Sequence, residues 1–133
     1  MTALTKDRNT NQRQGDEFNH PVAAGAHIYG GSIVVLDAAR NAKPGLTATG
    51  LVAAGRAQEE VNNVGGSAGD KTVQVRKGVF SFANDGSIAR VDIGGTAYIV
   101  DDQTVADTDG TGTRSAAGEI VDVDADGVWV KIG

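Results

Sequence analysis

Apolar and polar residues alternate with a period of two over much of the chain, which is the pattern of half-buried β-strands. In residues 119–133, Val121 and Val123 alternate with acidic residues, and after Asp126-Gly127 apolar residues return at every second position. An Asp-Gly pair between two such runs predicts a β-hairpin, because Gly takes positive φ at little cost. This hairpin is expected to bury one face and leave the other in water.

Further strands are predicted upstream of the hairpin. Residues 32–37 are a continuous apolar run rich in β-branched residues, which favours a buried strand over a helix. Residues 47–57 fit either periodicity, but their glycines and threonines favour a strand. Residues 71–83 form the longest strand candidate, and a change of parity at Lys77-Gly78-Val79 predicts a β-bulge inside it.

Eight or nine short strands separated by turns, with no predicted helix, indicate an all-β fold. The expected body is a small β-barrel or β-sandwich of short antiparallel strands. Nineteen glycines against two prolines agree with many tight turns. A chain of 133 residues is long enough for one domain with its own core. We predict that this body spans residues 21–133.

Residues 1–20 are almost wholly polar and predict an extended N-terminal arm. Leu4 and Phe18 are the exceptions, spaced like two anchors along it. The arm has too little apolar area to offset its chain entropy, so by itself it is expected to be mobile. It is either a disordered tail or a strap that becomes ordered on a partner.

The net charge of −5 is unevenly distributed, because residues 100–133 hold eight acidic and two basic side chains. An acidic surface argues against direct nucleic-acid binding, which requires Lys and Arg to displace counterions. No apolar run approaches the roughly 20 residues of a membrane span. The first residues lack the apolar stretch of a signal peptide, so synthesis in a cytoplasm is expected. With no cysteine, disulfides and thiolate zinc sites are excluded.

Asp122, Asp124 and Asp126 match the start of a calcium-binding loop. Such a loop requires a bidentate Glu at its twelfth position, which in this chain is Gly133. Strand alternation also places Asp122 and Asp124 together on a solvent face. We therefore predict no metal site, and these three aspartates are weak candidates only.

No set of residues indicates a catalytic centre. The serines lack the context of a nucleophile elbow. Adjacent acids such as Asp101-Asp102 point to opposite faces of a strand, so their adjacency does not make an acid–base pair. We expect neither an enzyme nor a bound cofactor.

Several segments of the chain have a familiar composition and order. They are Asp16-Glu17-Phe18, PVAAGAHIYGG (21–31), ATGLVAAGRA (48–57) and AYIVDDQTVA (97–106). Together they resemble the small Gly/Ala-rich capsid decoration (cement) proteins of tailed bacteriophages, which are also called head-stabilising minor capsid proteins. The resemblance covers most of the chain and includes no catalytic motif.

This resemblance implies a non-enzymatic structural protein that stabilises a phage capsid by bridging major capsid subunits. It would be made in the bacterial cytoplasm and end on the outer surface of the virion, often as a homotrimer. The arm would reach the major capsid protein, and Leu4, Arg8, Arg13 and Phe18 are expected to contact it. There are two alternatives. One is a tail- or fibre-associated virion component, and the other is a calcium- or carbohydrate-binding β-module that uses the acidic loops 101–109 and 122–126.

Overall fold

The computed structural model describes residues 2–13 and 15–133, so Met1 and Gln14 of the predicted arm lie outside the described residues. The prediction of an all-β fold is confirmed. No helix in the described part of the chain is long and apolar enough to cross a membrane. The elements are β1 (Glu17–Pro21), β2 (His27–Ile28), β3 (Ile33–Leu36), β4 (Ala42–Pro44), β5 (Val52–Ala57), β6 (Val61–Asn62), β7 (Thr72–Arg76), β8 (Gly78–Asn84), the 3-10 turn η1 (Arg90–Asp92), β9 (Thr96–Ile99), β10 (Thr104–Ala106), β11 (Ala116–Asp124) and β12 (Gly127–Ile132).

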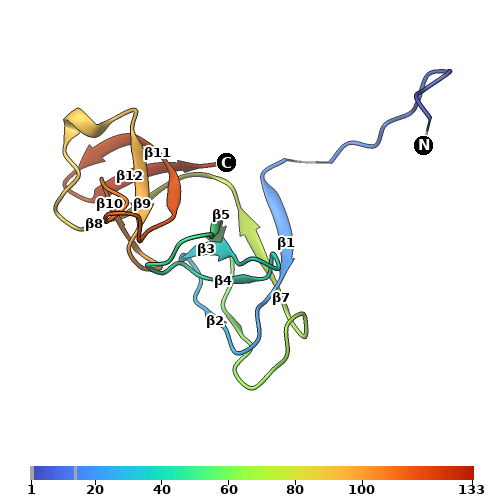
Figure 1. The fold of residues 1–133 in the computed structure, drawn as a ribbon, viewed down its shortest axis with the longest axis horizontal. Coiled ribbons are helices and arrows are strands. Elements are labelled where there is room, and N and C mark those ends of the chain that lie inside the picture. The colour runs from blue at the N-terminus through green and yellow to red at the C-terminus, as the bar shows by residue number, and fades with distance from the viewer. Residues whose placement is uncertain (1, 14) are drawn as a thin grey trace.

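The strands form two main units that lie side by side in Figure 1. One is a five-stranded sheet with the order β1-β7-β5-β3-β4, beside which β2 and β6 form a short ladder. The other is a closed barrel with the order β10-β8-β12-β11-β9. Strand pairing is antiparallel except between β10 and β8, which run parallel. The prediction of a small barrel or sandwich of short strands is confirmed, with a barrel present, and this parallel pair departs from the expected antiparallel pairing.

The chain passes from the sheet to the barrel between β7 and β8. The prediction of one strand over residues 71–83 with an internal bulge is wrong, because β7 ends at Arg76 and β8 begins at Gly78 in the other unit. The change of parity therefore has another cause. The valines of β7 pack in the core of the sheet, whereas Phe82 of β8 packs in the core of the barrel.

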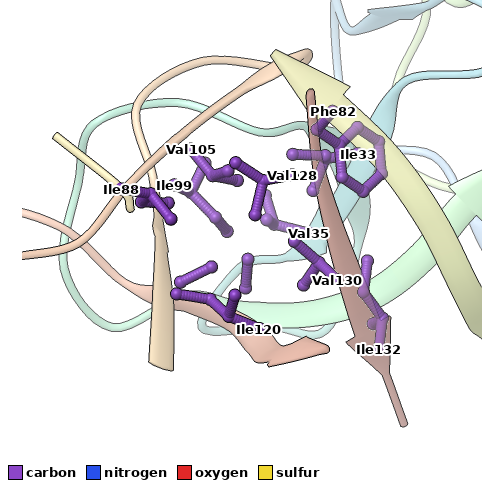
Figure 2. Packing of buried hydrophobic residues seen from close by; sticks show 12 residues of the cluster. Ile33, Val35, Phe82, Ile88, Ile99, Val105, Ile120, Val128, Val130 and Ile132 are labelled. Atoms are coloured by element: carbon purple, nitrogen blue, oxygen red, sulfur yellow. The ribbon is translucent and has the colours of Figure 1, made fainter. Parts of the chain in front are cut away.

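Strand β3 is buried on both faces and contributes to two hydrophobic cores. Ile33 and Val35 pack with the barrel residues, as Figure 2 shows, and Val34 packs in the core on the opposite face of the sheet. All three side chains are fully buried. The prediction of a buried strand within residues 32–37 is confirmed. The larger barrel residues around Ile33 and Val35 are Phe82, Ile88, Ile99, Val105, Ile120, Val128, Val130 and Ile132.

The predicted C-terminal hairpin is formed by β11 and β12. Asp124 pairs with Gly127, so the two residues between them make the turn, and the alternate apolar residues of β12 are buried in the barrel. The strict alternation predicted for the first strand is interrupted by a β-bulge between Ile120 and Asp122. As a result, Ile120 is buried and Val123 packs against the same core, although they are three positions apart.

The backbone of Arg76 lies so close to residue 55 in β5 that only glycine fits there. The φ of Gly55 is +145°, and a Cβ atom at this position would lie 2.3 Å from the carbonyl oxygen of Arg76. Arg76 is the last residue of β7, so the contact occurs where the chain leaves the sheet. A side chain at residue 55 would therefore push apart the strands that position the crossing.

Gly55→Ala should lower the free energy of unfolding by about 3 kcal/mol or more, because unfavourable φ and steric overlap add together. Gly50→Ala is the matched control, since Gly50 also has positive φ (+74°) but open space around it. It should cost about 1 kcal/mol, from the backbone conformation alone. Urea unfolding curves measure both values. Equal losses in the two variants would contradict the close-approach explanation.

Ser115 joins the barrel to the sheet through its buried hydroxyl. The Oγ atom donates to the carbonyl oxygen of Ala48 (2.7 Å) and accepts from the backbone N–H of Leu51 (3.2 Å). A second link runs through the backbone, where the N–H of Ile33 donates to the carbonyl of Asp102 at 2.8 Å. The two Ser115 bonds fix the loop before β5 against the barrel, and the Ile33 bond fixes the start of β3.

Ser115→Ala should destabilise the protein by about 1–3 kcal/mol, because it leaves the Leu51 N–H and the Ala48 carbonyl without their partner. Ser81→Ala, at an exposed position of β8, serves as the control and should change stability by less than about 0.5 kcal/mol. Urea denaturation followed by Trp129 fluorescence gives both numbers. A loss at Ser115 no larger than that at Ser81 would show that the bridge is not stabilising.

Candidate functional site

The arm extends away from the body on the side of the five-stranded sheet, opposite the barrel (Figure 1). Residues 2–13 are exposed, and the side chain of Leu4 is 72% exposed. Within this segment the N–H of Thr10 donates to the carbonyl of Arg8 at 3.0 Å, and no hydrogen bond joins these twelve residues to the rest of the described chain. Apart from Arg13, which packs on Phe18, this segment therefore presents its side chains to solvent.

The sheet begins before the end of the predicted 1–20 segment. Strand β1 starts at Glu17 and pairs with β7 in an unbroken antiparallel register. The carboxylates of Asp16 and Glu17 lie 3.2 and 3.5 Å from the guanidinium of Arg76. Both pairs are partly exposed, so each adds at most about 1 kcal/mol, and the backbone pairing of β1 is the main anchor of the arm.

Phe18 lies at the junction of arm and sheet and contacts cations from both. The guanidinium carbon of Arg13 is 4.7 Å from the Phe18 ring centroid, and the Nζ of Lys77 is 5.2 Å from it. The His20 ring stacks on the same residue at 6.4 Å. Of the four predicted contact residues, the structure thus brings together Arg13 and Phe18, whereas Leu4 and Arg8 lie apart on the arm.

Sequence reasoning missed Lys77 and His20 at this junction. The alternation predicts Lys77 inside one long strand, and nothing in the local pattern connects it to the arm. Partial burial, together with the positive charge of Lys77, lowers the pKa of His20 below its ordinary value. At neutral pH the His20 ring is therefore uncharged and behaves as a flat, weakly polar surface beside Phe18.

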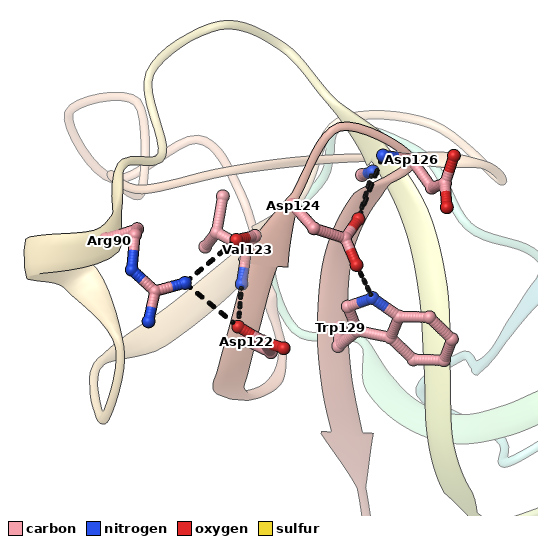
Figure 3. Close-up of polar contacts among 7 residues, drawn as sticks. Arg90, Asp122, Val123, Asp124, Asp126 and Trp129 are labelled. Carbon is pink, nitrogen blue, oxygen red and sulfur yellow. Dashed lines mark hydrogen bonds and ion pairs between the residues drawn. The ribbon is translucent and has the colours of Figure 1, made fainter.

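Two carboxylates of the C-terminal hairpin, those of Asp122 and Asp124, have hydrogen-bond donors in η1 and in the hairpin itself (Figure 3). Asp122 accepts a hydrogen bond from Arg90 Nη1 at 3.2 Å. Asp124 accepts one from the Trp129 indole N–H at 2.8 Å and another from the backbone N–H of Asp126 at 2.8 Å. These contacts stabilise the barrel wall and the turn.

The structure does not bring the three weak metal candidates into one site. In Figure 3 the Asp126 carboxylate points away from Asp124, and Asp122 faces Arg90. Across residues 2–13 and 15–133, no group of three or more acidic or histidine side chains is arranged to hold a metal ion. The acidic loop 101–109 is likewise tied to its own backbone, where Asp101 accepts from the N–H of Gln103 at 2.9 Å.

A hollow of about 440 Å³ lies between the sheet and the barrel and is lined by Tyr29, Gly30, Gly31, Ser32, Asp102 and Gln103. Two of the lining residues, Tyr29 and Ser32, carry hydroxyl groups, and the Ser32 Oγ donates to the carbonyl of Tyr29 at 2.8 Å. No histidine is among the described residues that line it. The Asp102 carboxylate also lines the hollow, but within the described residues no hydrogen bond joins it to Ser32 Oγ, so the structure does not pair this serine with a base.

Charge separates along the molecule. Residues 2–13 hold three basic and one acidic side chain, a net charge of +2, and residues 15–77 are balanced with six of each. Residues 78–133, which form the barrel, hold ten acidic and three basic side chains, a net charge of −7. The cationic arm and the acidic barrel therefore lie on opposite sides of the molecule (Figure 1).

Comparison of the chain with protein-family models, with curated proteins and with solved structures gives no match. The molecular surface has two distinctive parts, the exposed arm with the Arg13–Phe18–Lys77 junction and the acidic barrel.

Titration of Trp129 fluorescence should report the protonation of Asp124. The hydrogen bond from the Trp129 indole, followed by that from the Asp126 backbone, lowers the pKa of the Asp124 carboxyl. Because this pKa is lower in the folded than in the unfolded chain, the contact stabilises the hairpin at neutral pH and is lost as the pH falls through the folded value.

The fluorescence change should therefore occur below the ordinary range of an aspartate, and it should disappear in Asp124→Asn. Asp126→Asn is the control, because the Asp126 carboxylate does not contact the indole. An unchanged titration in Asp124→Asn would assign the signal to another group.

Proposed function

We propose that this protein is a non-enzymatic structural component of a tailed-phage head. It binds the outer surface of the capsid and stabilises it by bridging major capsid subunits. The observation that carries the proposal is the cationic segment 2–13 of the arm, which projects from a tightly packed β-body and has no hydrogen bond to the body among the described residues. The resemblance of four segments to capsid decoration proteins supplies the identity of the partner.

The division into arm and body suits attachment to a preformed shell. A ligand that binds only the expanded shell stabilises that state by mass action. An arm that becomes ordered on binding loses conformational entropy at that moment, so each copy binds modestly. A homotrimer would present three arms at once, and their linkage raises the overall affinity through effective concentration.

The charge distribution supports one orientation on the shell. The cationic arm and the neutral sheet face the capsid, and the barrel, with its net charge of −7, faces the solvent. An acidic outer surface keeps decorated particles apart and disfavours adsorption of free nucleic acid. The protein is made in the bacterial cytoplasm and is located on the outside of the virion.

Deletion of residues 2–13 should abolish co-sedimentation with expanded heads that were assembled without this chain. The deletion stops before β1, so the paired strand Glu17–Pro21 stays in place and the urea midpoint of the body should not change. The matched control is the double variant Asn9→Ala, Asn11→Ala, which alters the arm but retains Leu4, Arg8 and Arg13.

This control should bind like the unmodified chain. If the unmodified chain does not bind the heads, the proposed function is wrong. If the deleted chain binds as well as the full one, attachment does not use the arm.

A further inference from the structure

An apolar groove lies beside the point where the arm joins the sheet. We call it the junction groove, and it has a volume of about 210 Å³. Its lining includes Phe18, His20, Leu36, Val52, Ala54 and Lys77. These residues come from β1, β3, β5 and the crossing to β8, so the groove is built by the sheet and not by a single flexible loop.

The groove exists because β7 leaves the sheet early. β5 pairs with β7 only at Arg56 and Ala57, since β7 ends at Arg76. The preceding residues of β5, from Val52 to Ala54, have no β7 partner on that edge and form one wall of the groove, while Phe18 of β1 stands on the other side. The same crossing that separates the two units thus leaves an uncovered apolar site.

The size and chemistry of the groove suit one apolar side chain. An apolar cavity of about 150 Å³ holds a benzene molecule, so 210 Å³ accommodates a side chain the size of leucine or phenylalanine. Val52, the first residue of β5, is 43% exposed and so leaves apolar surface in contact with water. Covering this surface would release that water and favour binding.

Two cations without acidic partners contact Phe18, which forms one wall of the groove; Lys77 also lines the groove itself. Arg13 and Lys77 both contact the Phe18 ring, and neither has a carboxylate within 4 Å in the described residues. The remaining basic side chains of residues 2–13 add to the positive charge on this side. An acidic partner would complement it, whereas a basic one would be repelled.

We propose that the junction groove receives one apolar side chain from an extended, acidic segment of the major capsid subunit, with carboxylates of that segment pairing with Arg13 and Lys77. This inference rests on the proposed function and adds the part of the body that contacts the shell, together with the chemistry of its partner. The neutral His20 ring forms a wall of the groove that adds no charge to the apolar site. Arm and groove then form one continuous attachment surface.

Val52→Glu tests the groove, because it places a negative charge in the apolar site and opposes the partner carboxylates. Its matched control is Val91→Glu at η1 of the barrel, where Val91 is 92% exposed. Co-sedimentation with expanded heads assembled without this chain should weaken at least tenfold for Val52→Glu and stay unchanged for Val91→Glu. Lys77→Glu should weaken binding in the same way, whereas Lys77→Arg should retain it. Circular dichroism and urea unfolding verify that each variant is folded.

The outcomes separate this inference from the proposed function. If the unmodified chain does not bind heads, the proposed function fails and the groove has no shell partner. If it binds and Val52→Glu binds equally well, the groove inference alone is wrong. Two further measurements test other occupants of the groove.

Light scattering of the free protein tests a second copy of the chain. A lower mass for Val52→Glu than for Val91→Glu would show that the groove is a contact between copies and would overturn the proposal. NMR tests the chain's own Leu4: changed amide signals at residues 52–54 in Leu4→Ala would show that Leu4 occupies the groove and would overturn the proposal as well.

Discussion

Burial of β3 on both faces is the constraint on which the rest of the molecule depends. Ile33 and Val35 fill the barrel core, and Val34 fills the core on the other side of the sheet. Full burial of three such side chains contributes roughly 5–9 kcal/mol as an upper value. This is comparable to the whole stability of a typical domain, about 5–15 kcal/mol. The two units therefore stabilise one another through a shared strand, and neither has a complete core alone.

The body is stabilised by its own two hydrophobic cores, so residues 2–13 of the arm are not needed for folding. The polar residues 2–13 contribute no hydrogen bonds to the fold, and β1 holds their base through its register with β7. Affinity and stability can then be changed separately, because the first depends on the arm and the junction, and the second on β3 and the barrel. The early end of β7 connects the two properties, since it both starts the barrel and opens the junction groove.

The sequence predicts those features whose cause is local. The C-terminal hairpin follows from alternation around a turn, and the buried strand at 32–37 follows from an unbroken apolar run. Alternation cannot distinguish a β-bulge from a change of sheet, because both shift the parity by one residue, and this is why residues 71–83 were predicted as one strand. The contact of Phe18 with Lys77 joins residues far apart in the sequence and has no signal in the local pattern. The hydrogen bond between Asp124 and Trp129 lies inside the predicted hairpin, but alternation alone does not give side-chain partners.

The single crossing at Lys77 has a consequence for biosynthesis. All strands of the sheet lie within residues 17–76 and all strands of the barrel within residues 78–132, so the two halves are never interleaved. On the ribosome the first half can pair its strands before the barrel residues that pack on Ile33 and Val35 have been synthesised. The nascent sheet thus exposes an apolar surface until the second half emerges and closes over it. Chaperone contact during this interval would protect newly made copies from aggregation.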